Sequence, residues 1–244
     1  MKKVLCLIIA SLMLLCGCSD KTNSAQPTPT SDDYAFTINN NNIVSKSGVE
    51  YSCISKRGLC YLGDLEFIGS IQGEEKTSQH LSSTYTTGMF AIKNTNNENI
   101  LIRFAPNNEW ATIYRNTSLP EYDFSVDNCI RLEFVSGLGD ILADQIHTTC
   151  NDGITDESQI SAFLSEVRAQ KNPHDAGLYD LIKQPDGMLE NCYSYGIVYG
   201  FFEEEPNLAI KMNITSYNDL AYSIDIEGHH YVLPEQWLQT LENK

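Results

Sequence analysis

The chain has 244 residues and is acidic, with 32 Asp and Glu against 16 Lys and Arg, and 42% of its residues are hydrophobic. A hydrophobic fraction of this size is typical of globular proteins and argues against disorder along the whole chain. The formal net charge of −16 repels the phosphate backbone of nucleic acids, so the composition also argues against nucleic-acid binding.

Residues 1–17 are predicted to be a lipoprotein signal peptide. Two lysines precede Val4–Leu15, an uncharged run of 12 residues, whereas a bilayer-spanning helix needs about 20. The run ends in Leu15-Cys16-Gly17-Cys18, which resembles the bacterial lipobox. We therefore expect cleavage before Cys18 and lipidation of its thiol, with several acyl chains anchoring the protein. An ordinary secreted protein and an uncleaved anchor are the alternatives.

Residues 18–33 are predicted to be a disordered tether, because they contain one apolar side chain, Ala25, besides their prolines. Cleavage leaves a mature chain with a net charge of −18, of which residues 140–244 carry −13. Such a body is repelled by anionic lipid headgroups, which is consistent with a tether that holds it off the membrane. The acidic surface serves solubility or attracts cations or a basic partner.

Five further cysteines follow the lipidation site, and because five is odd at least one is unpaired within the chain. They are Cys53, Cys60, Cys129, Cys150 and Cys192. If Ser55–Gly58 form a four-residue hairpin turn, Cys53 and Cys60 lie opposite each other and are close enough for a disulfide. Buried free thiols are the alternative. The mature chain has no C-x-x-C and no zinc-type spacing, so neither a thiol oxidoreductase nor a structural zinc site is expected.

Residues 34–146 are predicted to form a β-rich domain. Short apolar stretches alternate there with clusters of Asn, Gly, Pro and Asp, a spacing that indicates an antiparallel sandwich or a small barrel. The predicted strands are Tyr34–Ile38, Gly48–Tyr51, Leu59–Ile71, Thr84–Lys93, Ile100–Ala105, Trp110–Arg115 and Cys129–Val135.

Residues 147–244 are predicted to form an α+β domain with an antiparallel sheet, which makes the whole chain α+β. Asp156–Lys171 is the clearest helix: Asp156 can cap it, and its apolar residues follow i, i+3, i+4, i+7 spacing. Four strand-like runs come next, and Pro234 can open a last short helix. The runs are Glu190–Phe202, Leu208–Ser216, Leu220–Glu227 and His230–Leu233.

No familiar catalytic motif occurs in the chain: H-E-x-x-H, G-x-S-x-G, S-x-x-K and the phosphate-binding glycine loops are all missing. Glu203–Glu205 is interpreted as a solvated edge that prevents sheet-to-sheet aggregation. Tyr193, Tyr195 and Tyr199 are two and four residues apart, so they are predicted to share one face of a strand. They would either stack on a sugar ring or a peptide, or pack against helices covering the sheet.

Several segments of the sequence, taken together, resemble the extracytoplasmic portion of BlaR-type antirepressor metallopeptidase sensors of Gram-positive anaerobes. They also resemble small lipoproteins that are related to this portion. The segments are Tyr61–Phe67, Phe124–Phe134, Ala176–Ile182 and Ser216–Tyr222. The resemblance covers about residues 49–244. The chain departs from that family because it lacks the membrane-embedded zinc peptidase motif and the sensor's serine followed three residues later by lysine. The resemblance therefore implies neither protease activity nor acylation by β-lactams, but an ectodomain-like body.

These observations predict a non-enzymatic surface lipoprotein, anchored through Cys18 to the extracytoplasmic face of the cell membrane. Its body is expected to bind an extracytoplasmic protein or small ligand, in a role such as envelope sensing, without a cofactor or metal. The alternative is a cell-wall-active hydrolase or inhibitor with an unrecognised site, in which Glu203 or Asp225 would face a histidine. A transporter's substrate-binding lipoprotein is disfavoured, because the chain is short and antiparallel for two doubly wound lobes.

Overall fold

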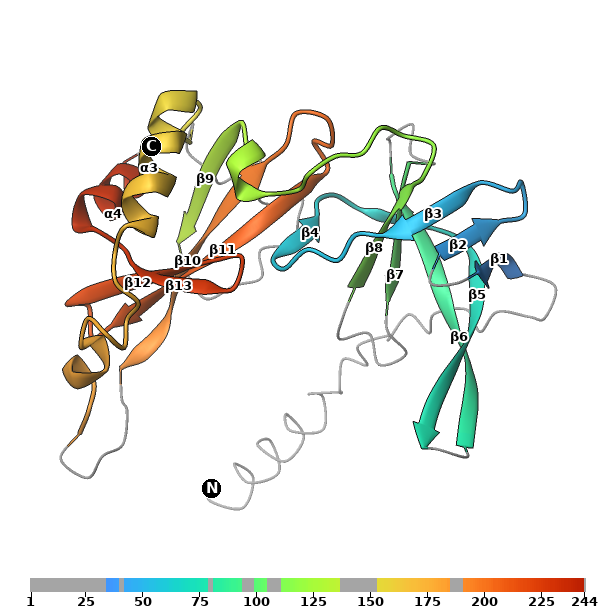
Figure 1. Ribbon diagram of the computed structural model, residues 1–244, viewed down its shortest axis with the longest axis horizontal. Coiled ribbons are helices and arrows are strands. Elements are labelled where there is room, and N and C mark those ends of the chain that lie inside the picture. Colours follow the sequence, from blue (N-terminus) through green and yellow to red (C-terminus); the bar gives the residue numbers. More distant parts are fainter. Residues whose placement is uncertain are drawn as a thin grey trace, which may run out of the picture. The chain divides into compact units, whose positions relative to one another are not determined.

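The computed structural model describes residues 34–39, 42–78, 81–93, 99–104, 111–136, 153–184 and 191–243. The predicted signal peptide, the tether with Cys18, and Cys150 lie outside these residues. Residues 34–244 form one compact unit. Two sheets dominate it, and few helices accompany them (Figure 1), so the predicted α+β class with an N-terminal β-rich region is confirmed.

Seven strands close into a barrel in the order β1-β2-β3-β8-β7-β6-β5. They are β1 (Tyr34–Asn39), β2 (Asn42–Ser45), β3 (Glu50–Cys53), β5 (Leu65–Ser78), β6 (Leu81–Ile92), β7 (Ile100–Phe104) and β8 (Ala111–Asn116). A parallel pairing of β1 with β5 closes the barrel, and the other neighbours are antiparallel. Of the two predicted architectures, sandwich and small barrel, the barrel is the one that forms.

The second sheet is antiparallel, with the order β13-β12-β11-β10-β9, and β4 pairs with β11. Its strands are β4 (Leu59–Tyr61), β9 (Arg131–Ser136), β10 (Cys192–Phe201), β11 (Leu208–Tyr217), β12 (Ala221–Ile226) and β13 (His229–Val232). The predicted domain boundary at residue 146 lies outside the described residues. Two strands of this sheet, β4 and β9, precede that boundary in the chain.

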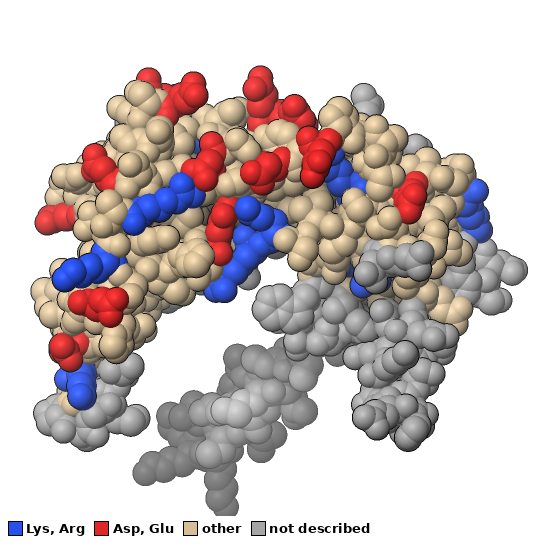
Figure 2. Space-filling model, in the orientation of Figure 1, with Lys and Arg blue, Asp and Glu red and all other residues tan. Residues whose placement is uncertain are grey.

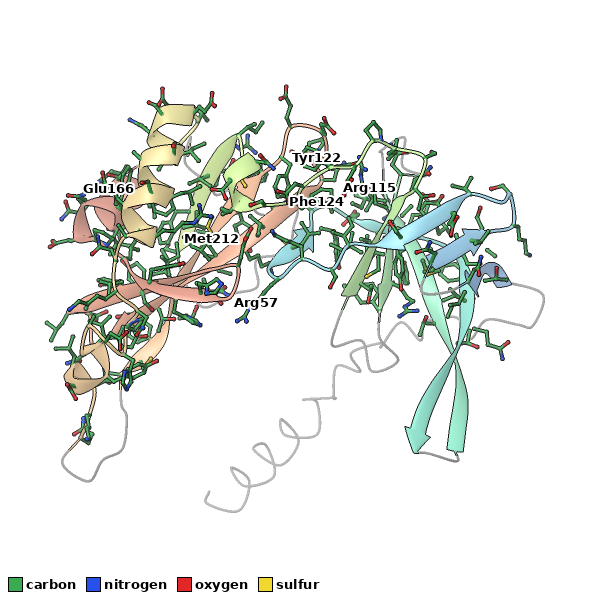
Figure 3. All side chains as sticks on the ribbon, viewed as in Figure 1. Arg57, Arg115, Tyr122, Phe124, Glu166 and Met212 are labelled. Carbon is green, nitrogen blue, oxygen red and sulfur yellow. The ribbon has the colours of Figure 1, made fainter. Side chains whose placement is uncertain are left out.

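Helices α3 (Glu157–Arg168) and α4 (Glu235–Glu242) contribute apolar side chains to one face of the second sheet, named here the helix-covered face. The Asp156 side chain accepts a hydrogen bond from the Gln159 backbone N–H, and the predicted apolar stripe of α3 is buried. The Glu166 carboxylate, labelled in Figure 3, joins the two helices by accepting hydrogen bonds from Gln236 and from the Trp237 indole, at 2.9 and 2.7 Å. The 3₁₀ helix η3 (Leu178–Leu181) packs near Tyr217, on the opposite face.

Strand β7 is buried on both sides and therefore joins the barrel to the second sheet. Its Leu101 belongs to the apolar cluster that fills the barrel, with six other residues. Ile100 and Ile102 point the other way and belong to the main core, with Met212 and Ile210 of β11. Burying a side chain such as Ile100 contributes about 1.5–3 kcal/mol, so exposing this outer face would be costly.

A buried ion pair crosses the same junction. Arg115 of β8 (Figure 3) lies with its Nε 3.2 Å from an oxygen of Glu205, in the turn between β10 and β11, and also donates to the Pro120 carbonyl. Both side chains are about nine-tenths buried, with relative exposures of 10% and 11%. The interpretation of Glu203–Glu205 as a solvated edge therefore holds for Glu203 and Glu204, which are exposed, and is wrong for Glu205.

Replacing one member of this pair should leave a buried charge without its partner. We expect Glu205→Ala to lower the free energy of unfolding by about 3–5 kcal/mol in urea denaturation. Glu204→Ala is the matched control, because its exposed side chain is the immediate neighbour, and its effect should stay within about 0.5 kcal/mol. Equal effects of the two substitutions would contradict a structural role for the pair.

Candidate functional site

A groove of about 570 Å³ runs along one side of α3 and is the candidate functional site. Its lining combines an apolar floor with polar and charged side chains. The lining residues are Asp127, Cys129, Glu157, Ile160, Ser161, Leu164, Ser165, Arg168 and Ala169. Five of these nine residues are polar or charged, so the groove is more polar than a typical small-molecule pocket, which is mostly apolar.

The periodicity of α3 builds one wall of this groove. Residues three and four apart lie on the same side of a helix, so Glu157, Ser161, Ser165 and Arg168 form one row. Ile160 and Leu164 lie beside that row, where they turn toward the sheet and are almost fully buried. The helix thus offers two hydroxyls in its middle, a carboxylate at its beginning and a guanidinium at its end.

The other wall comes from η2 (Val126–Asn128) and Cys129, which directly follows it. Glu227 holds this segment in place, because its carboxylate accepts a hydrogen bond from the Val126 backbone N–H at 2.9 Å and pairs with Lys56 at 3.1 Å. Glu227 and Gly228 form the two-residue turn between β12 and β13, and both have positive φ, 53° and 95°. This turn type matches the twist of a two-stranded hairpin.

An ion pair connects the two walls at one end of the groove. The Arg168 guanidinium donates to both carboxylate oxygens of Asp127, at 2.5 and 3.1 Å. The Asp127 side chain is about half exposed. The hydrogen bonds from Arg168 lower the pKa of the Asp127 carboxyl below its ordinary value, with a smaller contribution from Ser125, although partial burial opposes them.

The thiol of Cys129 contributes to the floor as an apolar group. Burial, followed by the negative charges of Glu227 and Asp127, raises its pKa to about 12. Its sulfur packs against Gly200 of β10, where an added Cβ would lie 2.5 Å from that sulfur. Because the thiolate is the nucleophilic form of cysteine, this thiol is unsuited to covalent catalysis at neutral pH.

The predicted site residues Cys53 and Cys60 are not joined by a disulfide. Cys53 lies opposite Tyr114 of β8, and Cys60 lies opposite Ala209 of β11, whose carbonyl accepts a hydrogen bond from the Cys60 thiol at 3.3 Å. The predicted hairpin is therefore wrong, because its two strands pair with distant strands in different sheets. Cys18, the predicted lipid-anchor residue, lies outside the described residues.

The predicted row of tyrosines on β10 is divided between the two faces of the sheet. The pairing of β10 with β11 shifts register between Ser194 and Gly196, which places a β-bulge at Tyr195. Tyr199 consequently lies on the face opposite the helices, where it is buried with Phe201 and Ile197. Tyr193 and Tyr195 lie on the helix-covered face, so the prediction that all three share a face is wrong.

Among the described residues, neither carboxylate considered for a hydrolase hydrogen-bonds a histidine. Glu203 is exposed in the turn after β10. Asp225 faces His230 across the β12–β13 hairpin, but the closest oxygen–nitrogen distance is 3.9 Å, longer than a hydrogen bond. The Asp225 oxygens instead accept from Arg57 at 3.2 Å and from the Gly228 backbone N–H at 2.7 Å.

The groove was not predicted from the sequence, because Asp127 and Arg168 are 41 residues apart.

Over the described ranges no cluster of three metal-ligating side chains is found. None of the helices within those ranges is both long and apolar enough to cross a bilayer. Comparisons of the chain with protein families, curated proteins and solved structures find no match.

The buried thiol makes a direct prediction about reactivity. With a pKa of about 12, roughly one Cys129 side chain in 10,000 is a thiolate at pH 8, so iodoacetamide should leave Cys129 unmodified in the folded protein. The exposed Cys192 is the internal control and should be alkylated, as followed by mass spectrometry of proteolytic peptides. Alkylation of both at similar rates without denaturant would contradict the assigned burial.

The Asp127–Arg168 pair should make stability depend on pH. Because folding lowers the pKa of Asp127, the pair stabilises the fold above the unfolded value of about 3.9, and this contribution disappears as the pH falls through the folded value. We expect Asp127→Asn to cost about 0.2–1 kcal/mol at pH 7 and progressively less in acid, measured by urea denaturation. The exposed neighbour Asp123→Asn is the control and should cost less than Asp127→Asn at pH 7, because Asp123 has no ion-pair partner among the described residues. A cost that grows in acid would contradict the assignment.

Proposed function

We propose that the protein is a non-enzymatic, lipid-anchored surface module whose α3 groove binds an extended segment of an extracytoplasmic partner. The proposed anchor is Cys18, and residues 18–33 would hold the body away from the membrane. The single observation that carries the binding function is the groove itself, with an apolar floor, two hydroxyls and an ion pair at one end. The resemblance to the ectodomains of antirepressor sensors supports a role in envelope sensing.

The dimensions of α3 fit an extended peptide. Ile160 and Leu164 are four residues apart, which is about 6 Å along a helix, and alternate side chains of an extended chain are about 6.6 Å apart. Successive inward side chains of such a peptide would therefore match the spacing of these two residues, each of which keeps 3% of its surface exposed. From Glu157 to Arg168 the helix extends about 16 Å, which is the length of about five extended residues.

The serine side chains of the groove would form hydrogen bonds with the peptide backbone. Ser161 and Ser165 belong to the lining, beside the apolar floor. A serine hydroxyl can donate one hydrogen bond and accept others, so these two could bond N–H and C=O groups that point away from the floor. Polar groups around an apolar centre are also the usual arrangement in protein–protein interfaces.

A non-enzymatic role agrees with the chemistry of the groove. Its one thiol, Cys129, has a pKa of about 12, and one of its two acids, Asp127, is paired with Arg168 and kept ionised by it. Neither group is prepared for nucleophilic attack or for proton transfer near neutral pH. The two residues are instead suited to fixing the shape of the groove.

Filling the groove tests the proposed function. A fluorescein-labelled Leu-Ser-Leu-Ser-Leu amide, followed by fluorescence polarisation, should bind the folded domain. Ser165→Trp should weaken that binding about tenfold or more, equal to at least about 1.4 kcal/mol. Gln159→Trp is the matched control, because Gln159 is an exposed position of the same helix that does not line the groove.

Two outcomes would overturn the proposal. One is equal binding by the Ser165 and Gln159 variants, and the other is binding of a penta-serine peptide as tight as that of the leucine peptide. The alternative, a cell-wall-active hydrolase or inhibitor, would need Asp225 and His230 to act together, although their closest atoms lie 3.9 Å apart, beyond hydrogen-bonding distance. Turnover of a peptide, glycan or ester substrate that His230→Ala abolishes would support a hydrolase in place of the binding module.

A further inference from the structure

A second group of side chains on the helix-covered face, away from the lining of the α3 groove, has the chemistry of a cation site. We name it the tyrosine patch and define it by Tyr193 and Tyr195 of β10, Tyr222 of β12, Asp219 in the β11–β12 turn and Glu242 at the end of α4. We propose that the tyrosine patch binds an arginine or lysine side chain of a basic peptide.

The rings of the patch are assembled by the bulge at Tyr195. Tyr193 of β10 and Tyr222 of β12 both lie beside Ser216 of β11, one on each side. The ring of Tyr195 stacks on Phe134, with centroids 6.1 Å apart, and meets Tyr222 edge to face at 4.8 Å. Gly196 permits this arrangement, because an added Cβ would lie 2.5 Å from the Phe134 ring.

Carboxylates hold the phenol groups and leave ring surface in solvent. The Tyr193 hydroxyl donates to Asp219, which also accepts from Ser216, and the Tyr195 hydroxyl donates to Glu242. These bonds raise the pKa of both phenols, so they remain neutral donors. The Tyr193 side chain is still 38% exposed. Leu220, which follows Asp219 in the β11–β12 turn, is 69% exposed.

The charge of the patch is negative, and that distinguishes it from the other aromatic groups of the protein. Elsewhere in the described part of the chain, rings carry a cation of the chain itself: Arg131 lies over Phe201 at 4.2 Å, Arg103 over Tyr114 at 5.6 Å and Lys211 over Tyr199 at 5.9 Å. Within the described residues, the charged groups that contact the patch tyrosines are Asp219 and Glu242.

A basic side chain satisfies both features of the patch. A guanidinium or ammonium group is attracted to the face of a tyrosine ring within about 6 Å of its centroid, and the neighbouring carboxylates add a direct charge interaction. The strongly acidic composition of residues 140–244 attracts the same class of partner over longer distances. Figure 2 shows scattered acidic side chains, most of them along the upper edge of the visible face, with lysines and arginines between them. An uncharged saccharide could stack on the tyrosine rings but would gain no charge interaction with the carboxylates.

The test uses the folded domain and a capped peptide that alternates glycine and arginine, titrated by NMR chemical-shift perturbation. Its control peptide carries citrulline in place of arginine, which keeps the shape and removes the charge. We expect the arginine peptide alone to bind, more weakly as salt rises. Tyr193→Leu should weaken binding about two- to fivefold, the usual contribution of one exposed cation–π contact. Asp219→Asn should weaken it as well.

Tyr179→Leu is the matched control, because Tyr179 has the same 38% exposure but packs against Tyr217 on the other face of the sheet. The Tyr179→Leu variant should bind the arginine peptide as tightly as the unchanged protein does. The Ser165→Trp variant, which blocks the α3 groove alone, should do the same. Failure at the patch is thus distinguishable from failure at the groove.

Equal binding of the citrulline and arginine peptides would overturn the proposal, as would unchanged binding by Tyr193→Leu and Asp219→Asn. Tetramethylammonium binding as tightly as the peptide would show a small-cation site instead. Maltotriose binding that Tyr193→Leu abolishes, without binding of the arginine peptide, would show a saccharide site. Far-UV circular dichroism and urea denaturation of each variant keep loss of folding separate from loss of binding.

Discussion

Strand β7 has no face that can be left in water, and much of the fold depends on this constraint. Ile100, Leu101 and Ile102 are all buried, although side chains of a strand alternate between its two sides. The inner side is covered by the barrel's own residues. The outer side needs cover from elsewhere: Ile100 and Ile102 belong to the main core, and Tyr61 of β4 packs edge to face on Phe104 of β7 at 6.3 Å. The outer side of the barrel therefore shares the main core with the second sheet, whereas the inside of the barrel has an apolar cluster of its own.

The buried pair of Arg115 and Glu205 lies at the same junction and has a different effect. Two paired charges in an apolar environment contribute little net stability, because desolvation offsets their attraction. A mispaired arrangement, however, would bury one charge alone, which is far more costly. The pair thus favours one register between β8 and the β10–β11 turn, while the isoleucines of β7 supply the burial that holds the two parts together.

The proposed binding surfaces follow from how the second sheet is covered. Helix α3 lies beside η2, and the space between them becomes the groove. The end of α4 brings Glu242 to Tyr195, which leaves the rings of the patch beside a carboxylate. Both surfaces therefore include a helix terminus and a residue from another element. Their electrostatic character differs: the groove contains a neutralised pair, and the patch is negative.

Local sequence signals predicted the local structure well. The capping residue Asp156 and the apolar period of α3 were sufficient to place that helix, and turn residues placed most strands to within a few positions. Pairing was less predictable where the partner was distant. Cys53 and Cys60 are seven residues apart, yet their partners Tyr114 and Ala209 are far along the chain. Those partners, and not the turn between the cysteines, decide where each thiol lies.

The candidate sites were harder to predict for the same reason. Nothing near Asp127 in the sequence indicates that Arg168 will bond to it, because the helix must first pack on the sheet. Glu205 shows the same limit. It belongs to a run of three acids that looks uniformly solvated, and the distinction among them arises only because Arg115 is buried nearby.

The bulge on β10 has a consequence beyond the position of three tyrosines. In a regular strand, odd and even positions are committed to opposite sides from one end to the other. An extra residue reverses that assignment for everything on one side of it. A single run of alternating tyrosines can therefore supply a buried ring at one end and solvent-facing rings at the other. One inserted or deleted residue in such a strand would exchange interior for surface without any change of amino-acid type.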